Sequence, residues 1–514
     1  MAEDTDSAVR SLVKGSGFIF VGFVLENGLA FVAKILMARL LGKTSFGEVS
    51  IGIILAANVS TIFVLGLHTG VARYLPRYDD PAKRKGVLVS AFRVVVPVVL
   101  VVGALLYLLA EPIARHVVRD VSVAPVIGVF ALATPFAAVL KLAIGAIQGS
   151  KRSLPKVYVR NIVQPVSRFV LIVAVFAVGL GTLGISWAYF GSYLLASAVA
   201  MYFVYRDTDL FSAVETVPMY RELLRFSAPL AVMAIASLIV SGIGIDTFMI
   251  AYFSSTDNVS EYNVVMPVAK LMIIILSSLA FLFMPIMSEL HAEGATEDME
   301  RLFQLATKWI VLATLPILTV MVAFPEQFIG LTFGSEYTPA ALSLAVLAVG
   351  FFVHSTLGLG QRLLNSVGST RLVMYDNILA AGVNVGLNLL LIPRVPVLGA
   401  AIGTAAAYVV LDLLYVYHVY SREGMHPFTA SLLKPALAGS MLLGGAAALA
   451  LGVFTVTPLG LVVWCAVLGP LYLVVAFRFG AVDEEEVMLV LSVEERFGID
   501  LGPLKRIGLR LMGE

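Results

Sequence analysis

Several long apolar stretches of this sequence are interrupted by charged or amide side chains. The first stretch, FVLENGLAFVAKILMARLLG (23–42), contains Glu26, Asn27 and Lys34. In a segment that crosses a bilayer, a charge near the centre costs roughly 2.5–3.5 kcal/mol, so it is a hypothesis of function by default. Five cations and three anions lie well inside such stretches, which leaves two positive charges if every anion is paired. These eight residues are Glu26, Lys34, Arg93, Lys141, Arg168, Asp246, Lys270 and Asp412.

The spacing of two cations favours an anionic ligand. Lys34 follows Asn27 by seven residues, and Lys270 follows Asn263 by seven. Residues seven apart lie on one stripe of a helix, so each amide is aligned with an amine. With Arg168 near the centre of its stretch, the cations would form a ladder. A ladder of this kind would keep a pyrophosphate group neutralised at each depth of a cavity.

A less specific interpretation stays open for some of these cations. Lysine and arginine side chains can reach several ångström to the membrane interface, and this covers Arg93 and Lys141. It stays open for Lys34 as well. Arg168 and Lys270 are harder to explain in this way, because they lie deeper in their stretches.

Three carboxylates lie among the cations. We interpret Glu26 and Asp246 as ligands of a coupling ion or as counter-ions. Asp412 is expected to be structural, because the later apolar stretches carry no other clear internal charge. Asn384 and Asn388, four residues apart, are expected to make hydrogen bonds between helices.

The composition explains what must position these side chains. The chain has 514 residues, of which 59% are hydrophobic and 13% charged, with a mean hydropathy of +0.95. A soluble domain carries about 25% charged residues. The apolar blocks are about 20 residues long, which is the length that crosses a bilayer as a helix. The sequence therefore predicts an all-α integral membrane protein.

Other classes of partner and cofactor are disfavoured. The net charge of +1 and the lack of basic arms give no indication of nucleic-acid binding. The single cysteine, Cys465, excludes disulfides and cysteine-ligated metals. We predict no metal and no cofactor. The polar, acidic start of the chain does not look like a signal peptide, so the first apolar block is expected to be a retained span.

The apolar blocks predict about fourteen transmembrane helices. The connections after even-numbered spans hold 18 lysines and arginines, Arg160 among them, whereas the odd-numbered ones hold five. Because short cytoplasmic loops are enriched in these residues, the asymmetry predicts cytoplasmic termini. The predicted spans are 17–40, 49–72, 87–110, 123–147, 157–179, 183–204, 226–252, 262–286, 305–324, 339–360, 372–392, 397–419, 432–453 and 457–478.

The chain also repeats itself at a period of about 215 residues. TSFGEV (44–49) after the first span matches DNVSEY (257–262) after the seventh. An even number of spans puts two such repeats in the same orientation, related by a pseudo-two-fold axis along the membrane normal. The predicted organisation is an N-lobe of helices 1–6, a C-lobe of helices 7–12, two extra helices, and a cytoplasmic amphipathic tail. Their bounds are 1–205, 206–420, 421–480 and 481–514.

Four stretches of the second half carry a family resemblance. ELLRFSAPL (222–230), MPIMSELHAEGATEDMERLFQLATKW (284–309), FGSEYTPAALSLAVLAVG (333–350) and the segment 368–408 resemble the polysaccharide-exporter and O-antigen (lipid-linked oligosaccharide) flippase family. That family belongs to the multidrug/oligosaccharidyl-lipid/polysaccharide (MOP) superfamily. The resemblance implies a V-shaped pair of six-helix bundles with two extra helices.

The resemblance also implies an activity and a site. Members move a polyprenyl- or dolichyl-linked sugar from the inner to the outer leaflet and have a cationic cavity with residues on spans one, two and eight. Lys34, Arg73 and Lys270 are the counterparts here, although Arg73 also fits a charge at a cytoplasmic helix end. With Asn27 and Arg168 they complete the predicted substrate-binding set. The expected partners are the lipid-linked sugar, membrane lipids and glycan-assembly enzymes.

Three functions compete for this sequence. The first is a flippase of the cytoplasmic membrane that translocates a lipid-linked oligosaccharide by alternating access, for polysaccharide or glycoprotein assembly. The second is a cation-coupled multidrug extrusion antiporter on the same fold, which would concentrate carboxylates in its cavity. The third is a membrane glycosyltransferase or polymerase, which needs a large external loop that this sequence lacks. The excess of cations favours the flippase, so we expect a transporter and not an enzyme.

Overall fold

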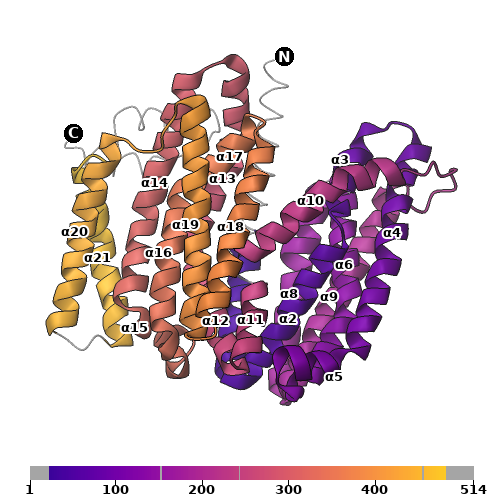
Figure 1. The fold of residues 1–514 in the computed structure, drawn as a ribbon, viewed down its shortest axis with the longest axis horizontal. Coiled ribbons are helices and arrows are strands. Elements are labelled where there is room, and N and C mark those ends of the chain that lie inside the picture. Colours follow the sequence, from indigo (N-terminus) through magenta and orange to yellow (C-terminus); the bar gives the residue numbers. More distant parts are fainter. Residues whose placement is uncertain (1–21, 23, 151–152, 242–243, 454–456, 482–514) are drawn as a thin grey trace. The chain divides into compact units, whose positions relative to one another are not determined.

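The computed structural model describes residues 22, 24–150, 153–241, 244–453 and 457–481, and these residues form helices without any strand (Figure 1). Most of the helices have the length and the apolar composition of membrane spans, which confirms the predicted class. The described part of the first predicted span is helical over residues 24–41. The predicted amphipathic tail lies outside the described residues, apart from Ala481.

The helices follow the predicted blocks closely. A helix of residues 24–41 comes first. The further helices are α2 (Lys43–Phe63), α3 (Leu67–Tyr74), α4 (Pro81–Leu108), α5 (Ala110–Ile113), α6 (Ala124–Gly149), α7 (Ser153–Val157), α8 (Gln164–Val178), α9 (Gly181–Asp207), α10 (Tyr220–Val240), α11 (Ile245–Phe253), α12 (Thr256–Ala269), α13 (Leu271–Glu293), α14 (Thr296–Ala323), α15 (Pro325–Thr332), α16 (Ala341–Leu357), α17 (Leu359–Ser366), α18 (Thr370–Leu391), α19 (Pro396–Glu423), α20 (Ala430–Val453) and α21 (Pro458–Arg478).

Five short turns of other helical types connect these helices. Two of them, η2 (Ala114–Val118) and η4 (Tyr158–Val163), are π-helical. The other three are 3₁₀ turns, η1 (Leu75–Arg77), η3 (Val121–Val123) and η5 (Ser335–Ala340).

Twelve helices of the described chain are long and apolar enough to cross a membrane. The number rises to 13 if α12 and α13, which bend by 40° at Lys270, form one span. The protein is therefore a multi-pass membrane protein. The predicted total of fourteen spans and the pseudo-two-fold relation between the halves stay predictions.

The chain divides into two compact units. We call Lys14–Val264 with Asn388–Ala400 the first unit, and Val265–Leu387 with Ala401–Glu514 the second unit. The first unit continues past the predicted boundary at residue 205 and includes α10, α11 and most of α12. The functional division into lobes at that residue stays a prediction.

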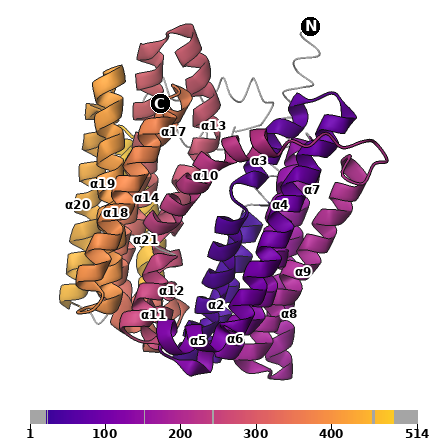
Figure 2. The same ribbon diagram turned by 45° about the vertical axis from the view of Figure 1, so that its right-hand side comes forward.

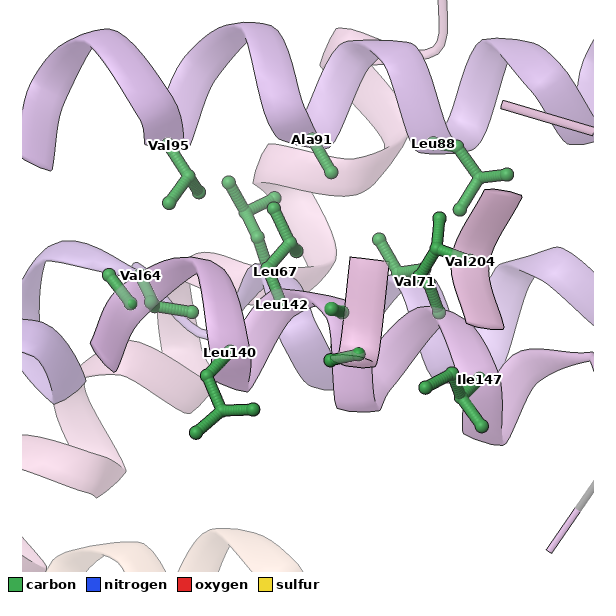
Figure 3. Close-up of a cluster of buried hydrophobic side chains, with 14 of the residues drawn as sticks. Val64, Leu67, Val71, Leu88, Ala91, Val95, Leu140, Leu142, Ile147 and Val204 are labelled. Atoms are coloured by element: carbon green, nitrogen blue, oxygen red, sulfur yellow. The ribbon is translucent and has the colours of Figure 1, made fainter. Parts of the chain in front are cut away.

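Helix α6 is the packing centre of the first unit. It contacts α2, α3, α4 and α9, and these helices lie side by side in Figures 1 and 2. Many of its buried residues are alanine or glycine, and small residues let membrane helices approach closely. Figure 3 shows buried aliphatic side chains that pack together from α3, α4, α6, α9 and the turn after α2: Val64, Leu67, Val71, Leu88, Ala91, Val95, Leu140, Leu142, Ile147 and Val204.

The predicted second span, 49–72, is broken between α2 and α3, which the sequence does not predict. Leu65 and Gly66 both have positive φ angles, of 53° and 69°. At Gly66 a side chain would also lie only 2.8 Å from the carbonyl oxygen of Ser227 on α10. Glycine is therefore required here by the left-handed backbone and by the close approach of α10.

The two copies of the repeated segment contact each other within the first unit. The ammonium group of Lys43 donates to Glu261 at 2.5 Å, and the hydroxyl of Thr44 donates to Asp257 at 2.7 Å. Glu261 is buried, whereas Lys43 is partly exposed. Gly47 faces the backbone of Thr256 so closely that a side chain would collide with it. The start of α2 is thus fixed to the start of α12.

We expect Lys43→Ala and Glu261→Ala each to destabilise the protein by about 1–3 kcal/mol. The expected loss of stability lies between that of breaking a buried ion pair and that of breaking an exposed one, because Glu261 is buried and Lys43 is partly exposed. The Lys43→Ala/Glu261→Ala double variant should recover part of the loss, since it leaves no buried unpaired carboxylate. Thermal unfolding in detergent measures all three, and strictly additive losses would contradict the pairing.

The second unit is built around α14, which contacts α13, α16 and α20. Tyr472 of α21 donates to the carbonyl oxygen of Leu312 on α14 at 2.6 Å. The rings of Phe324 and Trp464 pack edge to face with centroids 5.2 Å apart. The last two helices, α20 and α21, are therefore held against α14 by both apolar and polar contacts.

Candidate functional site

The predicted site residues fall in both units. Asn27, Glu26 and Lys34 lie on the helix 24–41 of the first unit, together with Arg73 at the end of α3, Arg168 on α8 and Asp246 on α11. Lys270 lies in the second unit, at the bend between α12 and α13.

Glu26 is at the centre of a charged cluster in the first unit. Its carboxylate accepts a hydrogen bond from the Asn161 amide at 2.6 Å. The guanidinium groups of Arg160 and Arg168 lie close enough to interact electrostatically with the same carboxylate. The ammonium group of Lys34 lies within range of electrostatic repulsion by the Arg168 guanidinium group. We call Glu26, Lys34, Arg160, Asn161 and Arg168 the cationic cluster.

A close helix contact brings Glu26 to Asn161. At Gly22, two residues before the helix 24–41, an added side-chain carbon would lie 3.1 Å from the side chains of Asn161 on η4 and Val157 on α7, so the chain lies tightly against these turns there. Glu26 is one turn further along the same face. The sequence alone does not identify a partner for Glu26, and the structure places Asn161 of η4 against it.

The π-helical turn η4 explains why Arg160 was missed. Arg160 was counted with the cytoplasmic loop charges, and in a regular α-helix it would be rotated roughly 80° from Arg168, eight residues later. The turn Tyr158–Val163 is π-helical and therefore winds over more residues. This reduces the rotation between the two arginines and lets both reach Glu26. A π turn leaves no clear signal in the sequence.

Arg168 is anchored against aromatic rings of α9. Its guanidinium carbon lies 5.6 Å from the centroid of the Tyr189 ring, and Tyr193 is also within electrostatic range. Tyr189 is buried and packs on Phe130 of α6, with ring centroids 5.7 Å apart. This contact fixes the guanidinium group inside the bundle, since an arginine over an aromatic face is stabilised by cation–π attraction.

Lys141 is within electrostatic range of Arg160 of the cationic cluster, and its hydrogen bonds hold it at α2. Its ammonium group donates to the carbonyl oxygen of Ala57 at 3.0 Å, to the hydroxyl of Ser60 at 2.8 Å and to the hydroxyl of Thr61. These contacts take up all three N–H groups near the end of α2. Lys141 therefore stabilises the end of α2 before its break, and it does not reach for the membrane interface.

Arg73 lies on an exposed part of the first unit. Its guanidinium carbon is 4.4 Å from the centroid of the Phe226 ring on α10, and Tyr74 packs edge to face on the same ring. The recorded contact of Arg73 is thus with α10, and its assignment to the substrate site stays a prediction.

Asp246 is completely buried in the first unit. Its carboxylate accepts from the Tyr262 hydroxyl at 2.7 Å and from the Asn388 amide at 2.8 Å. The contact with Asn388 confirms an interhelical hydrogen bond predicted for this residue. In the second unit, Asn384 lies 3.5 Å from the Thr404 hydroxyl, at the limit of a hydrogen bond. The role of Asp246 as a coupling or counter-ion stays a prediction.

Lys270 lies where α12 ends and α13 begins. Its ammonium group is 5.9 Å from the centroid of the Phe351 ring on α16. Pro267 precedes the bend, and a proline inside a helix removes a backbone hydrogen bond and favours a kink. Discontinuous helices often carry the binding residues of transporters, which is consistent with the prediction for Lys270.

Asp412 has a partner that sequence reasoning missed. The Nδ1 atom of His354 on α16 lies 2.9 Å from a carboxylate oxygen of Asp412 inside the second unit. The two residues are 58 apart in the chain, so no local spacing connects them. The histidine inside the tenth apolar block is a signal in the sequence, but by itself it identifies no partner.

Two family models match the chain. The model described as polysaccharide biosynthesis protein matches residues 12–291, and the model described as MatE matches residues 229–390. The first covers more than half of the chain, including the whole cationic cluster.

Two curated archaeal proteins are similar over part of the chain. An uncharacterized membrane protein of Methanocaldococcus jannaschii is 26% identical over 234 residues, which is 44% of this chain and 46% of that protein. The probable low-salt glycan biosynthesis flippase Agl15 of Haloferax volcanii is 24% identical over 192 residues, or 36% of this chain and 40% of that protein. The chain thus spans less than half the length of the curated relatives it matches.

Solved structures show the same fold. The lipid II flippase MurJ in an inward closed conformation has a TM-score of 0.73 at 12% identity, covering 89% of this chain and 97% of that one. An inward-facing multidrug resistance MATE family transporter of the MOP superfamily has a TM-score of 0.68 at 14% identity, covering 78% and 94%. At such identities the likeness concerns the fold alone.

Proposed function

The chain belongs to the polysaccharide biosynthesis protein family, whose model matches more than half of it, and from this premise we propose that it is a flippase for a lipid-linked oligosaccharide. The cargo is a sugar chain on a polyprenyl or dolichyl phosphate, moved across the cytoplasmic membrane by alternating access. The chain is oriented with both termini in the cytoplasm and works as a transporter, not as an enzyme. Glycan-assembly enzymes are its functional partners.

The cationic cluster is the observation that carries this proposal. The guanidinium groups of Arg160 and Arg168 are within electrostatic range of one carboxylate, Glu26, and Lys34 is within range of Arg168, inside a bundle of membrane helices. A site with excess positive charge attracts a phosphate or pyrophosphate group, and arginine in particular binds phosphate oxygens through two parallel hydrogen bonds. A carrier of organic cations would need the opposite balance of charge.

Each residue has a role in this proposal. Arg168, held by the aromatic rings of α9, and Arg160 bind the phosphate oxygens. Lys34 extends the positive charge along the first helix, and Asn27 adds an uncharged amide donor on the same face. Glu26 keeps Asn161 and the two guanidinium groups in place while no cargo is bound. Arg73 and Lys270 add cationic contacts at other stages of transport.

A cation-coupled multidrug antiporter is the second candidate. Two observations favour it: the MatE family model matches residues 229–390, and a MATE family transporter shares the fold. Two buried carboxylates, Asp246 and Asp412, could serve cationic drugs or coupling ions. The cluster of three cations favours the flippase over this alternative.

Deleting the gene in its native host separates the two candidates. For a flippase we expect lipid-linked glycan to accumulate in the membrane while the surface glycan is lost, and the wild-type gene to restore both. Mass spectrometry of extracted lipids and analysis of the surface glycan measure this. Unchanged glycans together with a new sensitivity to cationic drugs would overturn the flippase and support the antiporter.

A further inference from the structure

The connection between α9 and α10 lies against α4 in the first unit. We call residues 208–219 of this connection the strap, and none of them is helical. Figure 2 shows the strap leading from the end of α9 to the start of α10. It joins the predicted N-lobe to the predicted C-lobe after the sixth predicted span, which the predicted topology places on the cytoplasmic side. None of its residues is assigned above to the cargo.

The polar backbone groups of the strap are bound by α4. The ammonium group of Lys85 donates to the carbonyl oxygens of Ser212 and Val214, at 2.6 Å and 2.8 Å. The backbone amide of Val217 donates to the carbonyl oxygen of Ala82 at 3.4 Å. Backbone groups that are paired in this way do not need water. The strap therefore turns much of its polar backbone toward the protein.

The last residues of the strap pack most closely on α4. A side-chain carbon added at Gly86 would lie 1.8 Å from the carbonyl oxygen of Val217. The backbone amide of Met219 donates to the hydroxyl of Ser90 at 3.0 Å, and the Met219 side chain is buried in the core of the unit. Gly86 and Ser90 lie on either side of residue 87, where the third predicted span begins. The strap thus ends at the depth of the membrane edge.

The side chains that the strap exposes are apolar. Six of its residues are exposed, and Glu215 is the one charged residue among them. The exposed fractions of Phe211, Val214 and Val217 are 58%, 40% and 39%. Apolar side chains gathered on a surface in this way mark a contact with a protein or with a membrane.

Aromatic side chains continue this surface onto α9. The rings of Phe211 and Tyr205 have centroids 5.7 Å apart, and both Tyr205 and Tyr202 are exposed. Tyr158 of η4 packs edge to face on Phe203 of α9, with centroids 6.3 Å apart. Tyrosine is enriched where membrane helices leave the hydrocarbon, because its ring is apolar and its hydroxyl is polar. The strap is therefore continuous with the kind of surface that meets lipid.

The charges around the strap balance each other. The segments 77–85 and 206–219 contain five cations and five carboxylates. An oppositely charged partner would gain little from such a surface, so its apolar side chains must supply the contact. The charged residues are Arg77, Lys83, Arg84, Lys85 and Arg206 on one side of this balance, and Asp79, Asp80, Asp207, Asp209 and Glu215 on the other.

We propose that the strap is a membrane-docking loop whose partner is the lipid of the inner leaflet. Phe211, Val214 and Val217 insert at the boundary between headgroups and acyl chains, beside the tyrosines of α9. Lipid is favoured over a protein partner because the strap is continuous with the exposed aromatic surface of a membrane helix and ends at the membrane edge. Docking holds the start of α10 at the membrane surface. This inference goes beyond the proposed function and does not depend on the cargo.

Spin labelling of the full chain tests the docking. In a Cys465→Ser background, which removes the single native cysteine, Val214→Cys is labelled and reconstituted in phosphatidylcholine vesicles. Oxygen, which concentrates in the bilayer, and a water-soluble nickel chelate present on both sides then compete to relax the label. We expect oxygen to dominate at Val214→Cys. The matched control is Asp79→Cys, exposed in the loop before α4, where we expect the chelate to dominate.

Two results of this experiment would overturn the proposal. A Val214→Cys label as accessible to the chelate as the Asp79→Cys label would place the strap in water. A label protected from both relaxing agents would mean that protein, such as a second copy of the chain, covers the strap. Size-exclusion profiles show whether each variant is folded, and the exposed positions of both cysteines favour normal folding.

Two further changes test the role of the apolar side chains. Because the charges balance, adding phosphatidylglycerol to the vesicles should not shift the preference for oxygen at Val214→Cys. Adding Phe211→Glu to this labelled protein should lower that preference, whereas Phe211→Leu, which stays apolar, should keep it. Docking that occurs only with phosphatidylglycerol, or an unchanged preference in Phe211→Glu, would show that the apolar side chains do not hold the strap in the lipid.

Discussion

Arg168→Ala abolishes rescue of surface glycan in a deletion strain, whereas Arg93→Ala restores it fully: this is the largest effect we expect. Truncating one partner of a desolvated charged contact costs about 2–5 kcal/mol, which corresponds to at least about a thirtyfold loss. Arg168 combines contact with Glu26 and with the Tyr189 ring. Lys34→Ala should cause a similar loss, since Lys34 belongs to the same cluster.

Arg93 is a matched control for this experiment. It is also an arginine inside a membrane helix of the first unit, but its side chain is exposed on α4. Arg168→Lys adds a further comparison, because lysine keeps the charge but loses the planar group that binds phosphate and stacks on an aromatic ring. We expect it to rescue only partly. Full rescue by Arg168→Ala, with normal amounts of protein in the membrane, would remove the cluster from the binding site.

Asp246→Ala should destabilise the protein by about 2–6 kcal/mol. The change leaves the Tyr262 hydroxyl and the Asn388 amide without the acceptor they use, and each unsatisfied buried donor costs about 1–3 kcal/mol. Asp79→Ala, which removes an exposed carboxylate of the first unit, should change stability by less than about 0.5 kcal/mol. Thermal unfolding in detergent measures both.

Asp246→Asn separates a structural role from a role in ion coupling. The amide keeps one acceptor oxygen and the size of the side chain, so most of the stability should return. If the negative charge itself is needed for a coupling ion, this variant folds but fails to rescue surface glycan, and that is the result we expect. A variant that rescues fully would make Asp246 a structural hydrogen-bond acceptor only.

The membrane helices could be predicted from the sequence because their information is local. A block of about 20 apolar residues crosses a bilayer as a helix, because only a helix satisfies its backbone hydrogen bonds there, and this does not depend on the rest of the chain. The same holds for the charges of the first helix, since Asn27 and Lys34 are related by helical spacing alone. The sequence also shows that TSFGEV and DNVSEY are equivalent, but it does not predict that the two segments touch.

The side-chain partners could not be predicted in the same way. Glu26 meets Asn161, which is 135 residues away, and Asp412 meets His354 on a different helix. Such pairings depend on which helices pack together. Arg160 shows a second limit of prediction from sequence. A single π-helical turn changes the direction of every later side chain on that helix, and no residue pattern predicts such a turn.

The contact between the repeated segments has a consequence for how different the two halves must be. Thr44 and Asp257 occupy corresponding positions of TSFGEV and DNVSEY, and they bind each other. Two identical copies meeting in this way would place this position opposite its own equivalent, as at the axis of a self-complementary dimer interface. Two aspartates would repel, and two threonines would lose the charge-assisted bond. Divergence between the copies at this position is therefore a condition for the Thr44–Asp257 hydrogen bond.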